Sequence, residues 1–344
     1  MQDVCVALDA MGGDSGPAVV FPAAVAALKL HPQLRLILVG PRPLLDSHLQ
    51  KLPKALFASL NGRLVLQEAT ELVLMDEAPA AALRTKKDSS MRVAINLVQK
   101  GVAQACVSAG NTGALMAIAR YVLKTLPGVD RPAIVSALPS LHGSVYVLDL
   151  GANVDCTAEH LRQFATMGSI LAAAQKGISH PRVALLNVGS ESTKGSEQVK
   201  AAHLLLSSLK HINYVGFAEG DDIYLGNIHV IVCDGFVGNV ALKSSEGMAK
   251  LLLISLQNAF RANIFTKISA LIAKPVLQTL KQNFDPSRYN GASLLGLQGV
   301  VIKSHGSASI ASFVAAIDVA VKEAENNVPE KIRHEVAFQL SIAQ

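Results

Sequence analysis

The sequence predicts a three-layer α/β/α fold built around a mostly parallel sheet. Short β-branched runs recur along the 344 residues, and each is followed by a glycine or polar turn and then by an Ala- and Leu-rich stretch. Most of these runs are continuously apolar, which is typical of strands buried on both faces of a parallel sheet. Because strands and helices alternate, we expect right-handed βαβ crossovers.

Composition agrees with a large buried core. Half of the residues are apolar, 17% are charged and only 4% are aromatic. This balance excludes an intrinsically disordered chain, which needs low hydrophobicity and a high net charge. Four cysteines in 344 residues are too few for a disulfide-stapled scaffold. The length suits one large α/β domain, and we expect any second lobe to share its sheet.

Ten segments are predicted to form strands. In chain order they are Val4–Leu8, Leu34–Val39, Arg63–Leu66, Ala105–Ser108, Ala133–Ala137, Val145–Leu150, Val183–Leu186, Tyr214–Phe217, His229–Val232 and Val300–Lys303. No repeat, low-complexity segment or linker interrupts them. Residues 1–344 are therefore predicted to form a single α/β/α domain.

Residues 248–280 contain no predicted strand. Two helical patterns meet there near Arg261–Thr266, which predicts a protruding helical hairpin inserted into the domain. Its turn places Ile264, Phe265 and Ile268 beside cationic side chains, and apolar residues next to cations suit a membrane surface. A buried tip that forms a dimer is the alternative. A dimer that projects two tips would satisfy both readings.

The charge balance gives no sign of nucleic-acid binding. The net charge is +5, and the basic residues are dispersed without interleaved aromatic residues. This excess suits an acidic partner or an anionic lipid surface. The N-terminal segment MQDVCVALDAMGGD lacks the basic and long apolar regions of a signal peptide. We therefore expect a cytoplasmic location with reduced thiols.

Seven of the predicted strands open into turns rich in Gly, Asn, Ser and acidic residues. These turns span residues 9–17, 109–114, 151–155, 187–197, 218–222, 233–239 and 304–308. Ligands of open α/β sheets bind outside the carboxyl ends of the strands, so we expect the turns to share one edge. Glycine lets backbone N–H groups approach a ligand, and helix N-termini add free donors. Together the turns predict an anion site, although turn formation or helix capping explains each one alone.

Several standard motifs are absent. Residues 189–195 carry their lysine before the second glycine, contrary to the Walker A order, and neither G-x-G-x-x-G nor G-x-S-x-G occurs. The cysteines lack zinc-binding spacing, and the strand-end aspartates suit helix capping and ion pairing better than metal binding. We expect no metal and no other cofactor. His305 lies in a Gly/Ser turn, where it is either a proton donor, an anion ligand or a structural cap.

The turns taken together resemble those of the PlsX family of bacterial phosphate acyltransferases. The motifs that carry the resemblance are ALDAMGGD (7–14), KKDSSMRVA (86–94), SAGNTGA (108–114), RPAI (131–134), DLGANVD (149–155), LLNVGSESTKG (185–195), FAEGDDI (217–223), CDGFVGNVALKSSEG (233–247) and YNGASLLGLQGVVIKSHGSA (289–308). They occur in register over nearly the whole chain. One departure is Ser15–Gly16, where many members have a His–Ala pair, so a histidine base is unsupported there.

The resemblance implies an enzyme that moves a long-chain acyl group from the thioester of acyl carrier protein to inorganic phosphate. The acyl phosphate would serve phospholipid synthesis through a membrane glycerol 3-phosphate acyltransferase. The resemblance also implies a homodimer and a fold related to phosphotransacetylases and isopropylmalate dehydrogenases. Three alternatives stay open: an acyl-CoA:phosphate transferase of the phosphotransacetylase type, a metal-dependent decarboxylating dehydrogenase, and a non-catalytic membrane-associated scaffold for lipid synthesis.

Such a transfer needs a phosphate cradle and donors for the oxyanion rather than a nucleophile triad. Four side chains are assigned catalytic roles on this hypothesis. Lys194 is expected to bind phosphate, and Asn239 is expected to hold the oxyanion with the N–H groups of Gly235 and Gly238. Lys303 and His305 are expected to supply charge or protonate the departing thiolate.

Twelve further residues are predicted to bind phosphate or substrate in the same pocket. They are Asp9, Gly12, Gly13, Ser108, Asn111, Thr112, Gly113, Asn153, Ser190, Ser192, Gly235 and Gly238. Because acyl carrier protein is acidic, a basic docking patch is expected beside this pocket. Its candidates are Arg84, Lys86, Lys87, Lys243 and Lys250. Contact of Ile264, Phe265 and Ile268 with lipid would make the cytoplasmic protein peripherally membrane-associated.

Overall fold

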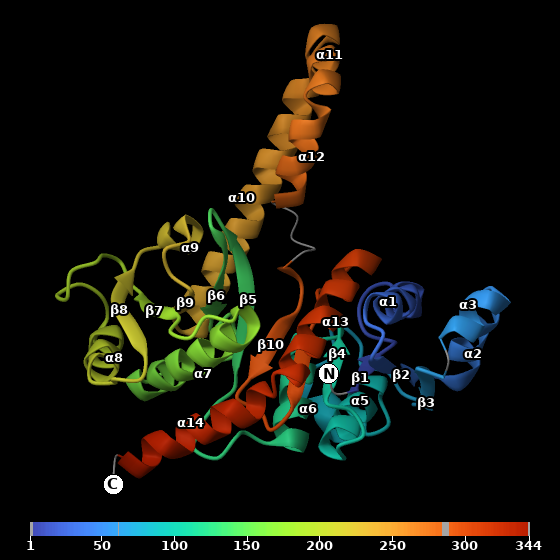
Figure 1. Cartoon of the computed structure of the whole chain (residues 1–344), viewed down its shortest axis with the longest axis horizontal. Helices are drawn as coiled ribbons and strands as arrows, with labels where there is room; N and C mark the ends of the chain where they lie inside the picture. The colour runs from blue at the N-terminus through green and yellow to red at the C-terminus, as the bar shows by residue number, and fades with distance from the viewer. Residues whose placement is uncertain (1–2, 61, 284–288, 343–344) are drawn as a thin grey trace.

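One sheet of eleven strands runs through the whole molecule, as the computed structural model shows (Figure 1). The structure describes residues 3–60, 62–283 and 289–342. The strands are β1 Val4–Asp9, β2 Leu34–Gly40, β3 Leu64–Glu68, β4 Ala105–Ser108, β5 Ala133–Ser140, β6 Gly143–Leu148, β7 Arg182–Leu186, β8 Asn213–Ala218, β9 Val230–Val232, β10 Ala292–Leu295 and β11 Val300–Lys303. All ten predicted strands are present, and β10 is an additional one.

Fourteen helices are described along the same stretches of chain. They are α1 Pro17–Leu30, α2 Arg42–Gln50, α3 Lys54–Ser59, α4 Pro79–Thr85, α5 Ser90–Gln99, α6 Thr112–Leu123, α7 Ala158–Lys176, α8 Glu197–Ser207, α9 Asp222–Leu225, α10 Gly235–Arg261, α11 Ile264–Ile272, α12 Lys274–Asn283, α13 Ile310–Glu325 and α14 Val328–Ile342. Polar side chains begin several of them. Ser89, Asn111 and Asp234 each accept a hydrogen bond from a backbone N–H group in the first turn of α5, α6 and α10, respectively.

Strand directions divide the sheet into two lobes. Its order is β3-β2-β1-β4-β11-β10-β5-β6-β9-β7-β8. The first lobe contains the parallel strands β3, β2, β1, β4 and β11, and the second contains the parallel strands β6, β9, β7 and β8. The junctions β11–β10, β10–β5 and β5–β6 are antiparallel. The strands of the second lobe therefore run opposite to those of the first.

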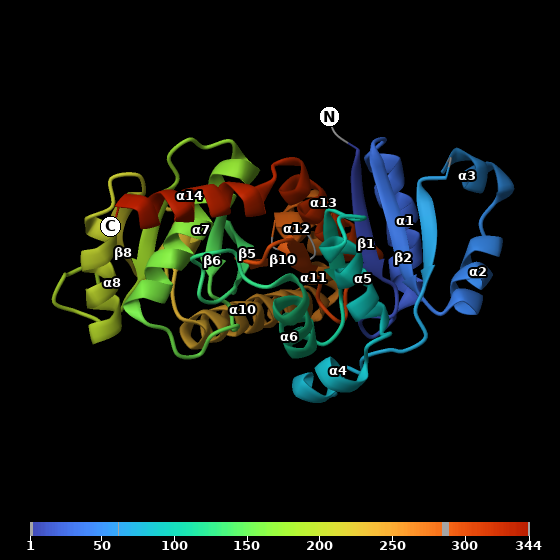
Figure 2. The same cartoon turned by 90° about the horizontal axis from the view of Figure 1, so that it is seen from below.

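Helices cover both faces of the sheet, which completes the predicted three layers (Figure 2). On one face, α1 and α13 pack on the first lobe, while α7 and α14 pack on the second. On the other face, α5 and α6 cover the first lobe and the start of α10 covers the second. Alternate residues of β1 belong to different clusters, with Val6 and Leu8 on one face and Ala7 on the other. This burial on both faces explains the continuous apolar runs in the sequence.

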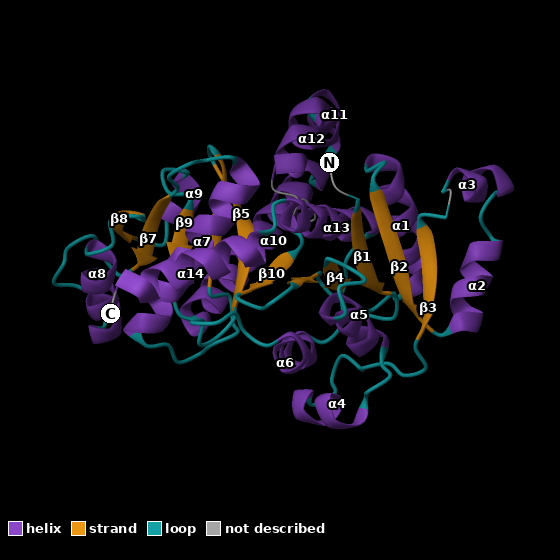
Figure 3. Cartoon of the chain, turned by 60° about the horizontal axis from the view of Figure 1, so that its bottom comes forward, coloured by secondary structure: helices purple, strands orange, loops and turns teal. Residues whose placement is uncertain are grey.

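The predicted helical hairpin is present and projects away from the sheet (Figures 1 and 3). It is longer than residues 248–280, because α10 continues without a break from the turn after β9 through its 27 residues. At 1.5 Å per residue α10 is about 40 Å long. Its buried residues are Gly235 and Gly238, both in the first turn or just after it, so most of the helix is uncovered. Within the described residues, no helix is both long enough and apolar enough to cross a membrane.

Candidate functional site

Three turns of the first lobe interlock at the carboxyl ends of β1, β4 and β11. The backbone N–H of Asp14 donates to the carbonyl oxygen of Gly306 at 2.9 Å, which joins the first turn to the third. The N–H of Ser304 donates to the oxygen of Ser108 at 2.8 Å, which joins the third turn to the second. Lys303 Nζ also donates to the oxygen of Ala109 at 3.3 Å. The expected meeting of these three turns is therefore found.

Glycine is required where these turns touch. A methyl group on Gly12 would lie 2.7 Å from the backbone nitrogen of Gly110. A methyl group on Gly13, whose φ is +85°, would lie 2.8 Å from the oxygen of Gly306. Neither position has room for a side chain, so the backbones of these turns pack directly against one another. Such backbone is suited to contact with an anion.

Asp9 organises the turns from below. Its carboxylate accepts hydrogen bonds from the hydroxyls of Ser90 and Ser108, both at 2.6 Å, and from the N–H of Met11 at 3.2 Å. Only 1% of Asp9 is exposed. Burial raises its pKa, and the bonds from Ser108 and Ser90 oppose that rise. Asp9 is therefore a positioning residue under the turns, and its partner Ser90 is not predicted from the sequence.

Lys303 is the half-buried cation of this group. Its Nζ contacts the oxygens of Ala109 and Ser304. Burial lowers the pKa of Lys303 to about 8, although the nearby charges of Asp9 and Asp14 act to raise it. Lys243 on α10 lowers it further, so α10 brings a second cation close to this turn. A lysine with this pKa carries a charge that changes near neutral pH.

His305 lies at the surface of the same turn. Its Nδ1 faces the hydroxyl of Ser307 at 2.9 Å and accepts from the N–H of Ser307 at 3.2 Å. The backbone N–H of His305 donates to Asn290 Oδ1 at 2.9 Å. The side chain thus caps the turn at Nδ1, and the imidazole remains exposed. The Asn290 contact was not foreseen from the sequence.

At the start of α6, the side chain of Asn111 is already hydrogen-bonded, whereas Thr112 and Gly113 are exposed. Asn111 Oδ1 accepts from the N–H of Ala114 at 3.0 Å, while its Nδ2 donates to the oxygens of Met75 and Glu77, both at 2.9 Å. Its polar atoms therefore cap the helix and hold the preceding loop. Thr112 and Gly113 are exposed beside it. Of this trio, Thr112 has the more accessible polar side chain.

In the second lobe, the buried carboxylate of Asp149 accepts hydrogen bonds from the surrounding segments, as the carboxylate of Asp9 does in the first lobe. Its carboxylate accepts from the N–H and the Nδ2 of Asn153 at 2.7 and 2.9 Å, from Ile134 N–H at 2.9 Å and from Ala152 N–H at 3.1 Å. Burial raises the pKa of Asp149, and these hydrogen bonds oppose the rise. Asn153 also donates to the oxygen of Pro132 at 2.8 Å, so its predicted side-chain donors are already engaged.

The first turn of α10 is fastened to the Asp149 loop. Gly235 N–H donates to the oxygen of Asn153 at 2.7 Å, and Gly238 N–H donates to the oxygen of Asp234 at 3.0 Å. Both N–H groups, which the sequence predicts to donate to the oxyanion, thus have backbone acceptors in the structure. Asn239 is exposed, and a methyl group on Gly151 would lie 3.6 Å from its Cβ. Its amide is the accessible donor of this group.

Lys194 lies in a third group, in the turn after β7. Its Nζ pairs with Glu191 Oε1 at 2.8 Å, and this partner raises the pKa of the lysine. Asn187 Nδ2 holds the turn by donating to the oxygens of Gly189 and Lys194, both at 3.1 Å. The nearby Ser190 and Ser192 are exposed. The turn presents polar groups, although its lysine charge is partly offset.

The expectation that all seven turns share one edge is wrong. The three turns of the first lobe follow β1, β4 and β11, whereas the other four follow β6, β7, β8 and β9, which run in the opposite direction. The physical reason is the reversal of direction at the antiparallel central strands. Helix α10 partly bridges the two groups, because it starts at the second-lobe edge and brings the charge of Lys243 near Lys303.

Two of the strand-end aspartates considered for metal binding have other partners. Asp234 Oδ1 accepts from Val237 N–H at 2.9 Å as the cap of α10, and Asp222 Oδ2 accepts from Glu219 N–H at 2.8 Å. Among the described residues, no group of three or more His, Cys, Asp or Glu side chains is arranged to hold a metal ion.

The chain matches a family model described as fatty acid synthesis protein over residues 4–331. It is 56% identical over 331 residues to a phosphate acyltransferase of Halorhodospira halophila, covering 96% of this chain and 95% of that protein. It is 57% identical over 343 residues to a phosphate acyltransferase of Nitrosococcus oceani, covering 100% of this chain and 99% of that protein.

Two solved structures are similar in fold. A phosphotransacetylase from Streptococcus pyogenes superposes with a TM-score of 0.61 at 18% identity, covering 94% of each chain. A branched-chain phosphotransacylase from Enterococcus faecalis superposes with a TM-score of 0.56 at 14% identity, covering 93% of this chain and 99% of that one. At these identities the likeness establishes the α/β/α fold alone.

Proposed function

This chain belongs to the fatty acid synthesis protein family that contains the phosphate acyltransferases, and from this premise we propose that its acyl donor is acyl carrier protein bearing a long-chain fatty acid. Transfer of an acyl group to phosphate is the reaction that the family membership supports. In the proposed reaction a phosphate oxygen attacks the thioester carbonyl, the carbon–sulfur bond breaks, and the carrier thiolate leaves. The acyl phosphate then serves phosphatidic acid synthesis through a membrane glycerol 3-phosphate acyltransferase.

The interlocked turns around Lys303 are the observation that carries this proposal. Phosphate is a weak nucleophile that must be held against the carbonyl, and a thiol ionises near pH ~8.5, so its departure needs little help. The glycine-rich backbone of the turns and the Lys303 ammonium suit the first task. The exposed imidazole of His305 suits proton delivery to the thiolate. The chemistry requires no nucleophile from the protein and no cofactor.

Asn239 joins this site through α10. Residues four apart lie on the same face of a helix, so Asn239 and Lys243 face the same way. Lys243 is close enough to Lys303 to lower its pKa. We therefore assign the oxyanion to the Asn239 amide. Lys194, with Ser190 and Ser192, remains a separate proposed anion contact of the second lobe.

A basic surface beside the first-lobe turns is the proposed docking site for the acidic carrier protein. Helix α4 packs against α6, whose N-terminus carries Asn111. Arg84 and Lys87 are exposed at the end of α4 and just after it, with the half-buried Lys86 between them. Opposite charge on the two partners would speed their encounter and orient the acyl thioester toward the turns.

The helical arm is the proposed contact with membrane and with a second copy of the chain. Its tip exposes 64% of Ile264, 76% of Phe265 and 53% of Ile268. Arg261 and Lys267 flank these side chains, which suits an anionic lipid surface. Leu251 and Leu252 are exposed farther down α10 and suit pairing in a homodimer. The continuous sheet supports one catalytic domain, with this arm as its insertion.

A donor comparison tests the proposal. Purified protein is incubated with palmitoyl carrier protein or palmitoyl-CoA, with and without phosphate, and acyl phosphate is trapped as the hydroxamate. We expect phosphate-dependent product and a higher kcat/KM with the carrier protein. A preference for palmitoyl-CoA would contradict the proposed donor and support the phosphotransacetylase type. A lack of product from either donor would support the scaffold alternative.

A further inference from the structure

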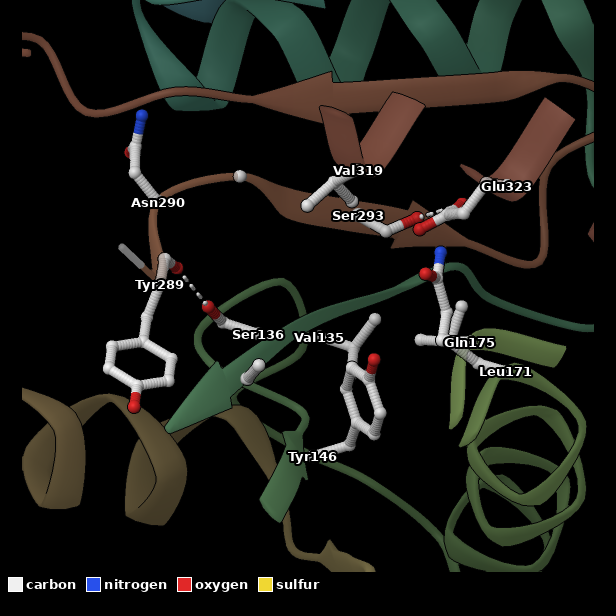
Figure 4. Close-up of a pocket in the computed structure, with 12 residues that line it drawn as sticks. Val135, Ser136, Tyr146, Leu171, Gln175, Tyr289, Asn290, Ser293, Val319 and Glu323 are labelled. Carbon is white, nitrogen blue, oxygen red and sulfur yellow. Dashed lines mark hydrogen bonds between the residues drawn. The ribbon is translucent and has the colours of Figure 1, made fainter. Parts of the chain in front are cut away.

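A small cavity lies where the two lobes meet (Figure 4). Its volume is roughly 60 Å³, and its walls come from β5, β6, β10, α7 and α13. None of the predicted site residues lines it. Most of the wall is apolar, including Val135, Leu171 and Val319. Among the polar side chains of the wall, Glu323 and Gln175 come from opposite lobes.

Each of these two side chains has a buried polar atom without a hydrogen-bond partner among the described residues. Glu323 is 2% exposed, and its Oε2 accepts from the hydroxyl of Ser293 at 2.9 Å. Among the described residues, its Oε1 has no hydrogen-bond partner, and neither has the buried Nε2 of Gln175. Buried polar atoms are nearly always satisfied by protein or by ordered water. Two unsatisfied atoms on one cavity wall therefore indicate a ligand between them.

The protonation state of Glu323 narrows the chemistry of that ligand. Burial raises the pKa of Glu323 to about 8, so the side chain is a neutral carboxylic acid at pH 7. A neutral carboxylic acid carries one O–H donor and one carbonyl acceptor, and the Gln175 Nε2 carries donors only. Because no direct hydrogen bond joins Glu323 Oε1 to Gln175 Nε2, a water that both donates and accepts can satisfy the two atoms. A monovalent cation fits poorly, because the acid is neutral and most of the wall is apolar.

We propose that this cavity is a built hydration site, in which ordered waters bridge Glu323 on α13 to Gln175 on α7 and so join the two lobes. One water needs about 10–15 Å³ of such space, so the cavity holds on the order of four. The site is independent of the proposed acyl transfer. It nevertheless borders the first-lobe turns, because Asn290 lines the cavity and accepts from His305 N–H at 2.9 Å.

The bridge makes the junction sensitive to pH. The titratable groups that line the cavity with Glu323 are Tyr146 from β6 and Tyr289 just before β10, and Lys176 of α7 lies over the Tyr146 ring at 5.3 Å. Tyr146 stays neutral, because burial raises its pKa well above the usual range. Glu323 therefore sets the response. Its raised pKa gives stability that is fully present below the unfolded pKa of ~4.3 and is lost as pH rises to about 8.

Two measurements on the full chain test the proposal. A crystal structure at pH 6 should show ordered water within hydrogen-bond distance of both Glu323 Oε1 and Gln175 Nε2. A direct bond between the two side chains, or a metal ion between them, would overturn the bridge. This measurement uses the wild-type chain, so it does not depend on whether a variant folds.

The second measurement is urea unfolding of wild type and of Glu323→Gln at pH 5.5 and 7.5. Between these values the folded-to-unfolded ratio of wild type should fall about 100-fold more than that of the variant, because the amide cannot ionise. Glu325→Gln is the matched control, since Glu325 is exposed on the same helix, and it should follow wild type. An equal pH dependence in wild type and Glu323→Gln would overturn the neutral, hydrated junction.

Discussion

The contact between α10 and the Asp149 loop can be tested by adding one methyl group at Gly238. A Cβ at this position would lie 1.9 Å from the carbonyl oxygen of Asp149 and 2.9 Å from Cys233 Sγ. A carbon–oxygen contact needs about 3.3 Å, so the helix must retreat by about 1.4 Å. That movement would break the 2.7 Å hydrogen bond from Gly235 N–H to Asn153.

The free energy of unfolding should fall by about 2 kcal/mol in Gly238→Ala. Overpacking costs about 1–3 kcal/mol, and the lost hydrogen bond costs about 1 kcal/mol more. The intrinsic helix preference of alanine over glycine returns about 1 kcal/mol. Because Asn239 would move with the helix, kcat should fall by up to ~100-fold while the protein remains folded.

Urea unfolding and single-turnover acyl transfer measure both effects. Gly247→Ala is the matched control in the same helix, because Gly247 is exposed and a methyl group there meets nothing within 4 Å. It should stabilise the protein by about 0.5–1 kcal/mol and leave activity unchanged. If Gly238→Ala is as stable and as active as Gly247→Ala, the close packing of α10 on the Asp149 loop is refuted.

Three further predictions concern charge and the helical arm. The affinity for phosphate should fall as pH rises through about 8, because Lys303 loses its charge there, and Lys303→Arg should lack this step; the same pH profile in both proteins would contradict the role of Lys303. Added salt should raise KM for the carrier protein with little change in kcat, and the combined variant Lys86→Glu, Lys87→Glu should do the same at low salt; an unchanged KM would exclude the α4 docking site. The combined variant Ile264→Asp, Phe265→Asp should lose binding to anionic liposomes but keep activity in solution, whereas Phe57→Asp, exposed on α3, should keep both; continued liposome binding by the tip variant would remove the arm as the membrane contact.

Most strands could be predicted because burial on both faces imposes an apolar run that is visible locally. Strand β10 could not, because its four residues Ala292–Leu295 lie between Gly291 and Gly296 and look like part of a glycine-rich turn. The direction of a strand is harder to predict from the sequence than its position. Only Leu141 and His142 separate β5 from β6, and so short a connection requires an antiparallel pair. The predicted strands end at Ala137 and resume at Val145, which is too far apart to indicate this connection.

The site was predictable in its residue types and less so in its roles. The turns were found from Gly, Ser and Asn after strands, and those of the first lobe do meet. The organising roles of Asp149 and Asn187 are not predicted, although Asp149 directly follows β6 and Asn187, like Asp9, directly follows a predicted strand. Whether such a polar group points inward or toward a ligand depends on hydrogen bonds to distant segments, such as Asp9 to Ser90. No local pattern contains that information.

The most direct test of the account is the coupling between phosphate consumption and release of the carrier thiol. Palmitoyl carrier protein is mixed with the enzyme across a range of phosphate concentrations, and free thiol and acyl phosphate are measured together. We predict a saturable dependence on phosphate, one acyl phosphate for each thiol released, and no thiol release without phosphate. Thiol release in the absence of phosphate would mean hydrolysis or transfer to the protein itself, and would contradict direct attack by phosphate.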